Sequence, residues 1–274
     1  MAKTIVILTL DNSPDLMQGK ALLSHMALAW ETQGVNVKIV RGIKEVFEAD
    51  VVVSHIDLTV VPNEYSEFVK NYPVAINGRI NDISKSLISN NLLQRESDYD
   101  GPVIVKTQAN YGGIPELIQG NGHEILERPW RRVQHLDSYN YPRFNAIRDV
   151  PNGVWRNDNL IVEKFLPEID SGGNYCLRKW FFFGDKNMGL YQTSSKPIVK
   201  FGDIENEIIS DVPDELKVLR ERLNMEYGRF DYAIVDGEVV IYDANKTPII
   251  GDVGLSLLGD KLDEFSAGIT QYLD

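Results

Sequence analysis

Runs of apolar residues separated by polar turns divide the first hundred residues into short strands and helices. Four of these runs are typical of buried strands: residues 4–10, 35–40, 49–54 and 74–77. Ser13 and Pro14 predict the start of a helix that stops at Gly34. Residues 63–72 predict a second helix, and Asp82 can cap a third. Strands that are apolar on both faces and alternate with helices indicate a parallel sheet covered by helices.

The polar stretch at residues 93–100 ends this pattern and marks the first boundary. Further strands are predicted at 103–106, 160–168, 175–184 and 188–195, and an amphipathic helix at 210–227. Residues 128–148 are basic and aromatic without periodicity, which indicates an irregular excursion. We therefore expect an α/β protein with a Rossmann-like lobe at residues 1–95, a small lobe at 96–160 and an α+β lobe at 161–274.

Residues 229–245 predict a hairpin, because two apolar strands flank an Asp-Gly turn. Three side chains with oxygen donors lie at the end away from the turn: Asp231, Asp243 and Asn245. Such hard ligands suit Mg²⁺, which takes one or two carboxylates and completes its shell with water and phosphate oxygens. The alternative is an exposed hairpin whose acidic side chains lie in solvent.

Loop length decides whether the three donors share a face, since neighbouring residues of a strand point to opposite faces. A two-residue turn would pair Asp231 with Tyr242 and separate the two carboxylates. A three-residue loop, with Gly237 in the left-handed region as a bulge, would pair Asp231 with Ile241. All three donors would then face the same way, so we expect the three-residue loop.

Composition narrows the class of protein. The chain has 274 residues, of which 43% are hydrophobic and 25% charged, as in ordinary globular proteins. A net charge of -12 disfavours binding to nucleic acid, although a single nucleotide can be held locally. The lone Cys176 excludes an internal disulfide and favours a reducing cytoplasm. The apolar run at residues 4–10 is too short to span a bilayer, so no membrane association is expected.

The order of these motifs resembles that of the ATP-grasp superfamily, in particular the branch of glutathione synthetase and the ribosomal-protein glutamate ligases. Five features follow in the family's order: a strand with a lysine, a glycine loop, an apolar strand ending Glu-Lys-Phe-Leu, a strand with an arginine, and a hairpin with Asp-x-Asn. The resemblance covers residues 82–250. It implies a Rossmann-like N-terminal lobe, then a two-lobed ATP-grasp fold formed by residues 96–160 and 161–274.

The resemblance implies that ATP is held by several of these motifs. The family's two phosphate-contacting lysines fall on Lys85 and Lys106. A lysine that closes an apolar strand is costly unless it meets an anion, although Lys106 could instead snorkel to solvent. The glycine loop that closes over the triphosphate is matched by Asn110, Gly112 and Gly113. A plain turn is the alternative for that loop.

The adenine and ribose contacts follow from the next strand. Main-chain groups of the family's linking strand hold the adenine, and the matching residues are Glu163, Lys164, Phe165 and Leu166. Glu168, or alternatively Asp170, is suited to accept hydrogen bonds from ribose hydroxyls. Arg178 takes the position of the family's arginine, whose planar fork suits phosphoryl and acyl-phosphate oxygens. Its neighbour Lys179 points the other way and is expected to be exposed.

The resemblance also implies the metal ligands, Asp231, Asp243 and Asn245, for Mg²⁺ or Mn²⁺. Two departures from the family's pattern limit what it implies. Asp243 stands where the family usually has glutamate, so the number of metal ions stays open. Residues 246–250 replace the family's small residues and Pro-Gly, so the acceptor substrate cannot be carried over.

The resulting hypothesis is an ATP- and Mg²⁺-dependent ligase that joins a carboxylate to an amine or thiol through an acyl phosphate. Arg178 and Lys106 are its expected catalytic residues, and its substrates are small molecules or peptides. Two alternatives remain open: a small-molecule kinase on the same scaffold, and a nucleotide-binding module without catalysis. A cytoplasmic protein is expected, and a homodimer is one option that the sequence leaves open.

Overall fold

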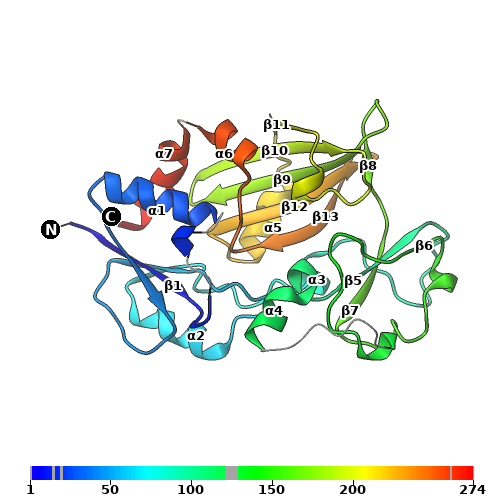
Figure 1. The fold of residues 1–274 in the computed structure, drawn as a ribbon, viewed down its shortest axis with the longest axis horizontal. Helices are drawn as coiled ribbons and strands as arrows, with labels where there is room; N and C mark the ends of the chain where they lie inside the picture. The colour runs from blue at the N-terminus through cyan, green and yellow to red at the C-terminus, as the bar shows by residue number, and fades with distance from the viewer. Residues whose placement is uncertain (1, 14–15, 19–20, 121–128, 260, 274) are drawn as a thin grey trace.

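The computed structural model describes residues 2–13, 16–18, 21–120, 129–259 and 261–273 (Figure 1). Three sheets organise these residues. The N-terminal sheet contains β1 (Thr4–Thr9), β2 (Asn36–Arg41), β3 (Val51–Ser54) and β4 (Val74–Ile76). Its strands are parallel in the order β2-β1-β3-β4, with α1 (Leu22–Thr32) and α2 (Asn63–Phe68) in the connections. The parallel arrangement of alternating strands and helices expected from the apolar runs is present.

The start of the first helix differs from the prediction. Helix α1 begins at Leu22, after a short 3-10 turn over Leu16–Gln18, and not at Ser13. The Leu22 N–H donates to the carbonyl of Pro248, 2.9 Å away. A contact from the far end of the chain therefore satisfies the first turn, which a local capping signal cannot anticipate. Pro14, the other half of that signal, lies outside the described residues.

The C-terminal sheet is antiparallel in the order β11-β10-β9-β12-β13, and β8 pairs with β9. Its strands are β8 (Glu168–Ile169), β9 (Tyr175–Phe183), β10 (Lys186–Ser194), β11 (Asn206–Ser210), β12 (Tyr227–Val235) and β13 (Glu238–Asn245). The helix predicted at 210–227 is wrong at both ends. Helix α5 is Glu215–Arg222: β11 extends to Ser210, residues 211–214 connect the strand to the helix, and Asn224, with a φ of 51°, ends it.

The small sheet has the order β6-β5-β7 and consists of β5 (Val103–Thr107), β6 (Arg143–Phe144) and β7 (Leu160–Lys164). Figure 1 shows it opposite the β12 and β13 end of the C-terminal sheet, with α3 (Lys85–Ile88) and α4 (Ile114–Gln119) nearby. The excursion expected at 128–148 contains β6 and two 3-10 turns, Trp130–Arg132 and Ile147–Asp149. Its first residue, Arg128, lies outside the described residues.

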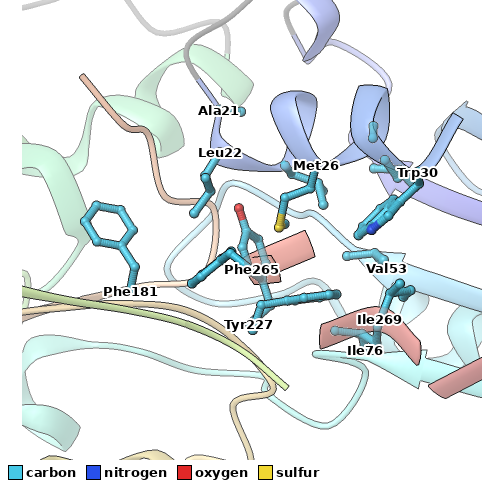
Figure 2. Close-up of a cluster of buried hydrophobic side chains, with 14 of the residues drawn as sticks. Ala21, Leu22, Met26, Trp30, Val53, Ile76, Phe181, Tyr227, Phe265 and Ile269 are labelled. Atoms are coloured by element: carbon cyan, nitrogen blue, oxygen red, sulfur yellow. The ribbon is translucent and has the colours of Figure 1, made fainter. Parts of the chain in front are cut away.

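One apolar cluster joins the N-terminal sheet to the C-terminal sheet (Figure 2). Trp30 of α1, Phe183 of β9 and Ile269 pack in this cluster, and each is at most 2% exposed. The last helices, which were not predicted, complete this cluster: α6 (Asp252–Leu258), α7 (Lys261–Ser266) and α8 (Thr270–Leu273). The Trp30 indole donates to the carbonyl of Ser266 at 2.9 Å. The two ends of the chain therefore pack together and support one face of the C-terminal sheet.

A buried histidine makes the stability of this support depend on pH. His55 follows β3, and burial lowers its pKa from 6.5 to about 4. The unfolded chain therefore binds this proton between about pH 6.5 and 4 while the folded chain does not, so stability falls as the pH falls through that window. Between pH 7 and 5 we expect this residue to cost about 2 kcal/mol. Urea unfolding of wild type and His55→Asn at both pH values should show a smaller loss in the variant; equal losses would contradict this assignment.

Candidate active site

The acidic hairpin has the expected shared face, but a different loop produces it. Val235 pairs with Glu238, so the turn has only two residues, and both have positive φ, 52° for Asp236 and 85° for Gly237. The predicted three-residue loop is therefore wrong. The extra residue lies instead further along β13, where the register shifts by one at Tyr242. This bulge places Asp231 directly opposite Asp243, with Asn245 on the same face.

Both carboxylates meet cationic side chains. The guanidinium of Arg229 binds Asp231 through two hydrogen bonds, from Nε to Oδ1 at 2.7 Å and from Nη2 to Oδ2 at 3.0 Å. The ammonium of Lys85 lies 3.4 Å from Oδ1 of Asp243, and its side chain is 2% exposed. A buried lysine is stable only with such partners. The site is therefore a compact cluster of alternating charges.

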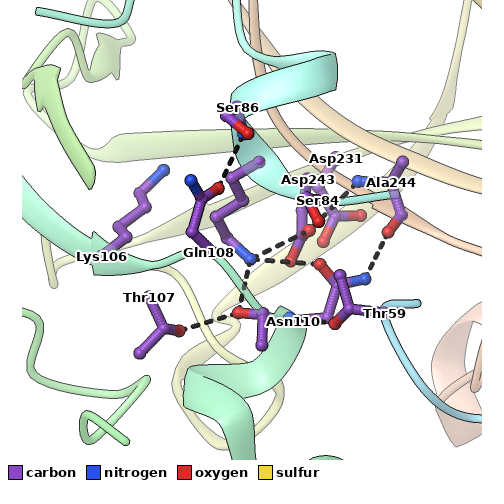
Figure 3. A network of polar contacts seen from close by, with 12 residues as sticks. Thr59, Ser84, Ser86, Lys106, Thr107, Gln108, Asn110, Asp231, Asp243 and Ala244 are labelled. Carbon is purple, nitrogen blue, oxygen red and sulfur yellow. Dashed lines mark hydrogen bonds and ion pairs between the residues drawn. The ribbon is translucent and has the colours of Figure 1, made fainter. Parts of the chain in front are cut away.

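A network of hydrogen bonds ties this cluster to the glycine loop (Figure 3). Lys85 donates to the carbonyl of Ala109 and to Oδ1 of Asn110, both at 3.1 Å. The amide of Asn110 donates to the carbonyl of Ala244 at 2.6 Å, and its N–H donates to the hydroxyl of Thr59 at 2.8 Å. Asn110 thus connects the segment between β3 and α2, helix α3 and the acidic hairpin.

Lys106 forms a second buried ion pair. Its ammonium lies 2.6 Å from Oε2 of Glu163, whose side chain is fully buried. Glu163, expected to act through its main chain, therefore also supplies a carboxylate. Residues 163–166 line the same cleft as Lys106, but the N–H of Phe165 donates to Pro102 and the carbonyl of Leu166 accepts from the Tyr242 hydroxyl at 2.6 Å. These two main-chain groups are already engaged.

The glycine loop is packed against a neighbouring segment in this structure. Gly112 is buried with a φ of 70°, and its carbonyl accepts from the N–H of Leu136 at 3.0 Å. A Cβ at Gly112 would lie 2.0 Å from the Leu136 carbonyl, so only glycine fits there. Gly113 also has a positive φ, 82°. The structure brings Asn110 to the carboxylates, while the two glycines shape the turn behind it.

The structure does not bring Arg178 and Glu168 to the carboxylate pair. Arg178 lies opposite Tyr232, so it points to the other face of the sheet from Asp231. There it binds Glu168 through a bidentate pair, with contacts of 2.7 to 3.0 Å. Glu168 also accepts from the N–H of Ile234 at 2.8 Å, so this carboxylate is engaged away from the cleft. Asp170 holds a local turn through Asn174.

Three cationic residues that were not predicted as site residues lie beside the carboxylate pair. Lys179 is opposite Asp231 on the neighbouring strand, and Lys200 and Arg229 line the same cleft. Burial lowers the pKa of Lys179 to about 8 and also lowers the pKa of Lys200. Lys179 was expected to be exposed, which is wrong. Alternation along the strands could have identified Lys179 as a site residue, because Asp231 and Lys179 share a face once β9 and β12 are paired.

Two adjoining clefts meet at the carboxylate pair. The first lies between the small sheet and the C-terminal sheet, and its lining includes Lys85, Lys106, Glu163, Lys164, Phe165, Leu166 and Tyr242. The second runs over the C-terminal sheet and encloses about 1450 Å³, open solvent at its mouth included; its lining includes Asn110, Lys179, Gln192, Glu207, Arg229 and Asn245. Asp231, Asp243 and Lys200 line both. A group held at this junction would meet ligands from both clefts.

The donor set fits a magnesium ion that binds through few protein ligands. Within the described residues no group of three or more acidic, histidine or cysteine side chains forms a metal cage. Mg²⁺ needs only one or two carboxylates when phosphates and water complete its shell. The hydrogen bond and the ion pair of Asp243 both use Oδ1. Oδ1 of Asn245 accepts from the N–H of Thr247 at 2.8 Å, which orients that amide.

No family model matches the sequence, and no curated protein matches it either. Solved structures do match the fold. The ATP-grasp ligase PsnB complexed with its minimal precursor has a TM-score of 0.61 at 10% identity over the whole of both chains. A RiPP-associated ATP-grasp ligase of Chryseobacterium gregarium, in complex with ADP and a leader and core peptide, has a TM-score of 0.58 at 9% identity, covering 99% of this chain and 96% of that one.

The likeness extends to a ligase of another kind. D-alanine–D-alanine ligase from Bacillus anthracis has a TM-score of 0.52 at 12% identity and covers all of this chain and 97% of its own. These neighbours share one architecture, and the chain therefore has the ATP-grasp fold. Within the part of the chain that the structure describes, no helix is both long enough and apolar enough to cross a membrane.

Proposed function

We propose that the protein is an ATP- and Mg²⁺-dependent ligase that joins a carboxylate to an amine or thiol through an acyl phosphate. The observation that carries this proposal is the position of Asp231 opposite Asp243, at the junction of two clefts and among four cationic side chains. The ATP-grasp fold and the ligases that share it support the same class of reaction. The expected lobes of this proposed enzyme are residues 1–95, 96–160 and 161–274, with the last boundary moved to the end of β7, because Leu160–Lys164 pairs with β5 in the small sheet.

The first cleft is the proposed nucleotide site. Main-chain atoms of residues 163–166 other than the N–H of Phe165 and the carbonyl of Leu166 would meet the adenine, and Lys106 and Lys85 would meet the phosphates. A metal ion held by Asp231, Asp243 and Asn245 would offset the phosphate charge. Each lysine has an anionic partner in the protein, Glu163 or Asp243, which fixes the position of the ammonium before the nucleotide binds.

The second cleft is the proposed site for the acid and the nucleophile. Lys179 and Arg229 flank Asp231 on the sheet floor and would bind the carboxylate that attacks the γ-phosphate. The carboxylate oxygen forms a bond to phosphorus as ADP leaves, and the nucleophile then displaces phosphate from the acyl carbon. The same two cations would stabilise the oxyanion of that second step. Positioning and charge account for most of the rate, since no protein nucleophile takes part.

ADP release is the direct test of the proposed function. The full-length protein should release ADP only with Mg²⁺, a carboxylate and an amine or thiol together, and mass spectrometry should detect the condensed product. A phosphorylated acceptor would instead identify a kinase. Nucleotide binding without ADP release in any substrate mixture would identify a binding module and contradict the proposal.

Neighbouring residues on β9 provide a matched comparison of the two faces. Lys179→Met should lower turnover about a hundredfold, because it removes one cation that faces the reacting group. It should not lower stability, since the charge that it removes is partly buried and has no ion-pair partner within 4.0 Å among the described residues. Arg178→Met should instead lower the free energy of unfolding by about 2 kcal/mol through the loss of its contacts with Glu168, and retain turnover in the folded fraction. Steady-state kinetics and urea unfolding check both; the reverse pattern would return the catalytic role to Arg178.

A further inference from the structure

Gln192 on β10 carries a buried carbonyl that the fold leaves without a partner. The side chain is 2% exposed, and its Nε2 donates to the carboxylate of Glu207 on β11. A carboxylate can only accept, so the amide must present its nitrogen to Glu207 and its oxygen elsewhere. Within the described residues Oε1 of Gln192 has no hydrogen-bond partner. An orphaned buried acceptor is costly, which indicates that a donor from outside the protein completes it.

Both side chains line the second cleft; the half-buried carboxylate of Glu207 is the acceptor that the cleft reaches, and the buried amide oxygen of Gln192 lies behind the same surface. Gln192 and Glu207 line that cleft on its sheet floor, directly opposite each other across β10 and β11. Glu207 forms no ion pair within 4.0 Å among the described residues; Lys179 is near enough to act on it only through its charge. An amide oxygen beside a carboxylate suits a group that is cationic and donates several hydrogen bonds. A primary ammonium meets both requirements.

The position of this pair sets the length of the ligand. The sheet order places β9 between β12 and β10, so Gln192 lies two strands from Asp231 and Glu207 lies three strands away. At about 4.8 Å per strand the two ends of the cleft floor are on the order of 10 Å apart. In an α-amino acid the ammonium and the carboxylate share one carbon, so one molecule cannot reach both ends. A longer spacer can.

We propose that Gln192 and Glu207 form a recognition subsite for a primary ammonium that lies several bonds away from the carboxylate activated at Asp231 and Asp243. The inference rests on the proposed function, because it takes the carboxylate pair as the reacting end. Two sources share this chemistry: an ω-amino acid and the N-terminus of a peptide. Lys179, between the two ends, would contact the carboxylate of either one.

Binding of paired probes tests the subsite. Calorimetry on the full-length protein with Mg²⁺ and ADP would compare 6-aminohexanoate with hexanoate, and triglycine with N-acetyltriglycine. We expect at least one amine to bind about tenfold or more tightly than its uncharged counterpart. The better pair identifies the source of the ammonium. Equal binding within both pairs would overturn the inference.

Variants separate the subsite from the fold and from the nucleotide site. Glu207→Gln should abolish the preference for the amine, while Glu238→Gln, at the exposed hairpin tip, should keep it. Gln192→Met should also reduce the preference and yet leave the melting temperature unchanged or higher, since it removes the orphaned carbonyl; a purely structural Gln192 would lose stability. If ADP and Mg²⁺ bind wild type but Glu207→Gln retains the preference, this inference alone fails. If ADP does not bind, the proposed function fails.

Discussion

Asparagine in place of Asp243 should lower Mg²⁺-dependent ADP formation at least about a thousandfold. The substitution keeps the shape of the side chain and removes the charge that faces Lys85, the opposing Asp231 and both clefts. Lys85 retains its contacts with Ala109 and Asn110, so the helix that carries it should stay in place. The initial rate of ADP release at saturating substrates measures the effect.

The same hairpin offers a matched control. Asp236→Asn makes the identical chemical change at the exposed turn, where a positive φ of 52° suits asparagine. It should leave turnover unchanged within about twofold. Thermal melts of both variants would show whether lost activity reflects lost structure. A folded Asp243→Asn variant with wild-type turnover would remove the metal assignment.

The largest effect on stability is expected at the ion pair of Lys106 and Glu163. Lys106→Met leaves a carboxylate that is fully buried without its cation, which should cost about 3–5 kcal/mol in the free energy of unfolding. Chemical unfolding at pH 7.5 measures this loss.

A double variant separates the structural role of this pair from its role toward the nucleotide. Lys106→Met with Glu163→Leu removes both charges and should restore most of the lost stability, because well-packed apolar residues replace a buried pair at little cost. It should still bind ATP weakly, since one of the cations that line the first cleft is gone. A double variant that binds ATP as tightly as wild type would exclude Lys106 from phosphate binding.

The shared face of the acidic hairpin could be predicted because it depends on local rules. Alternation along a strand and the Asp-Gly turn limit the register to a few choices, and two of these differ by one residue. The loop expected from the shared face is wrong, since the bulge that produces this face, at Tyr242, lies away from the turn. The hydroxyl of Tyr242 donates to the carbonyl of Leu166 on another segment. A contact between segments far apart in the sequence therefore accompanies the bulge.

That Lys179 and not Arg178 faces the carboxylate pair also depends on contacts between segments far apart in the sequence. The sequence places two cations side by side on β9, and the strand pairing alone decides which one faces the cleft. Glu168 also becomes the partner of Arg178 only when β8 pairs with β9. For the two lysines, Lys85 and Lys106, phosphate contact stays a prediction; the sequence indicated only that the ammonium of Lys106, at the end of an apolar strand, needs an anion. Their protein partners, Glu163 and Asp243, depend on tertiary structure.

In the proposed enzyme a divalent cation and ATP are held together at the carboxylate pair. A crystal structure with ADP and Mn²⁺, examined at the manganese absorption edge, tests it most directly. We predict an anomalous peak within bonding distance of Asp231 and Asp243 and next to a phosphate oxygen, with the adenine against residues 163–166. Manganese bound elsewhere, or ADP outside the cleft between the small sheet and the C-terminal sheet, would contradict the claim.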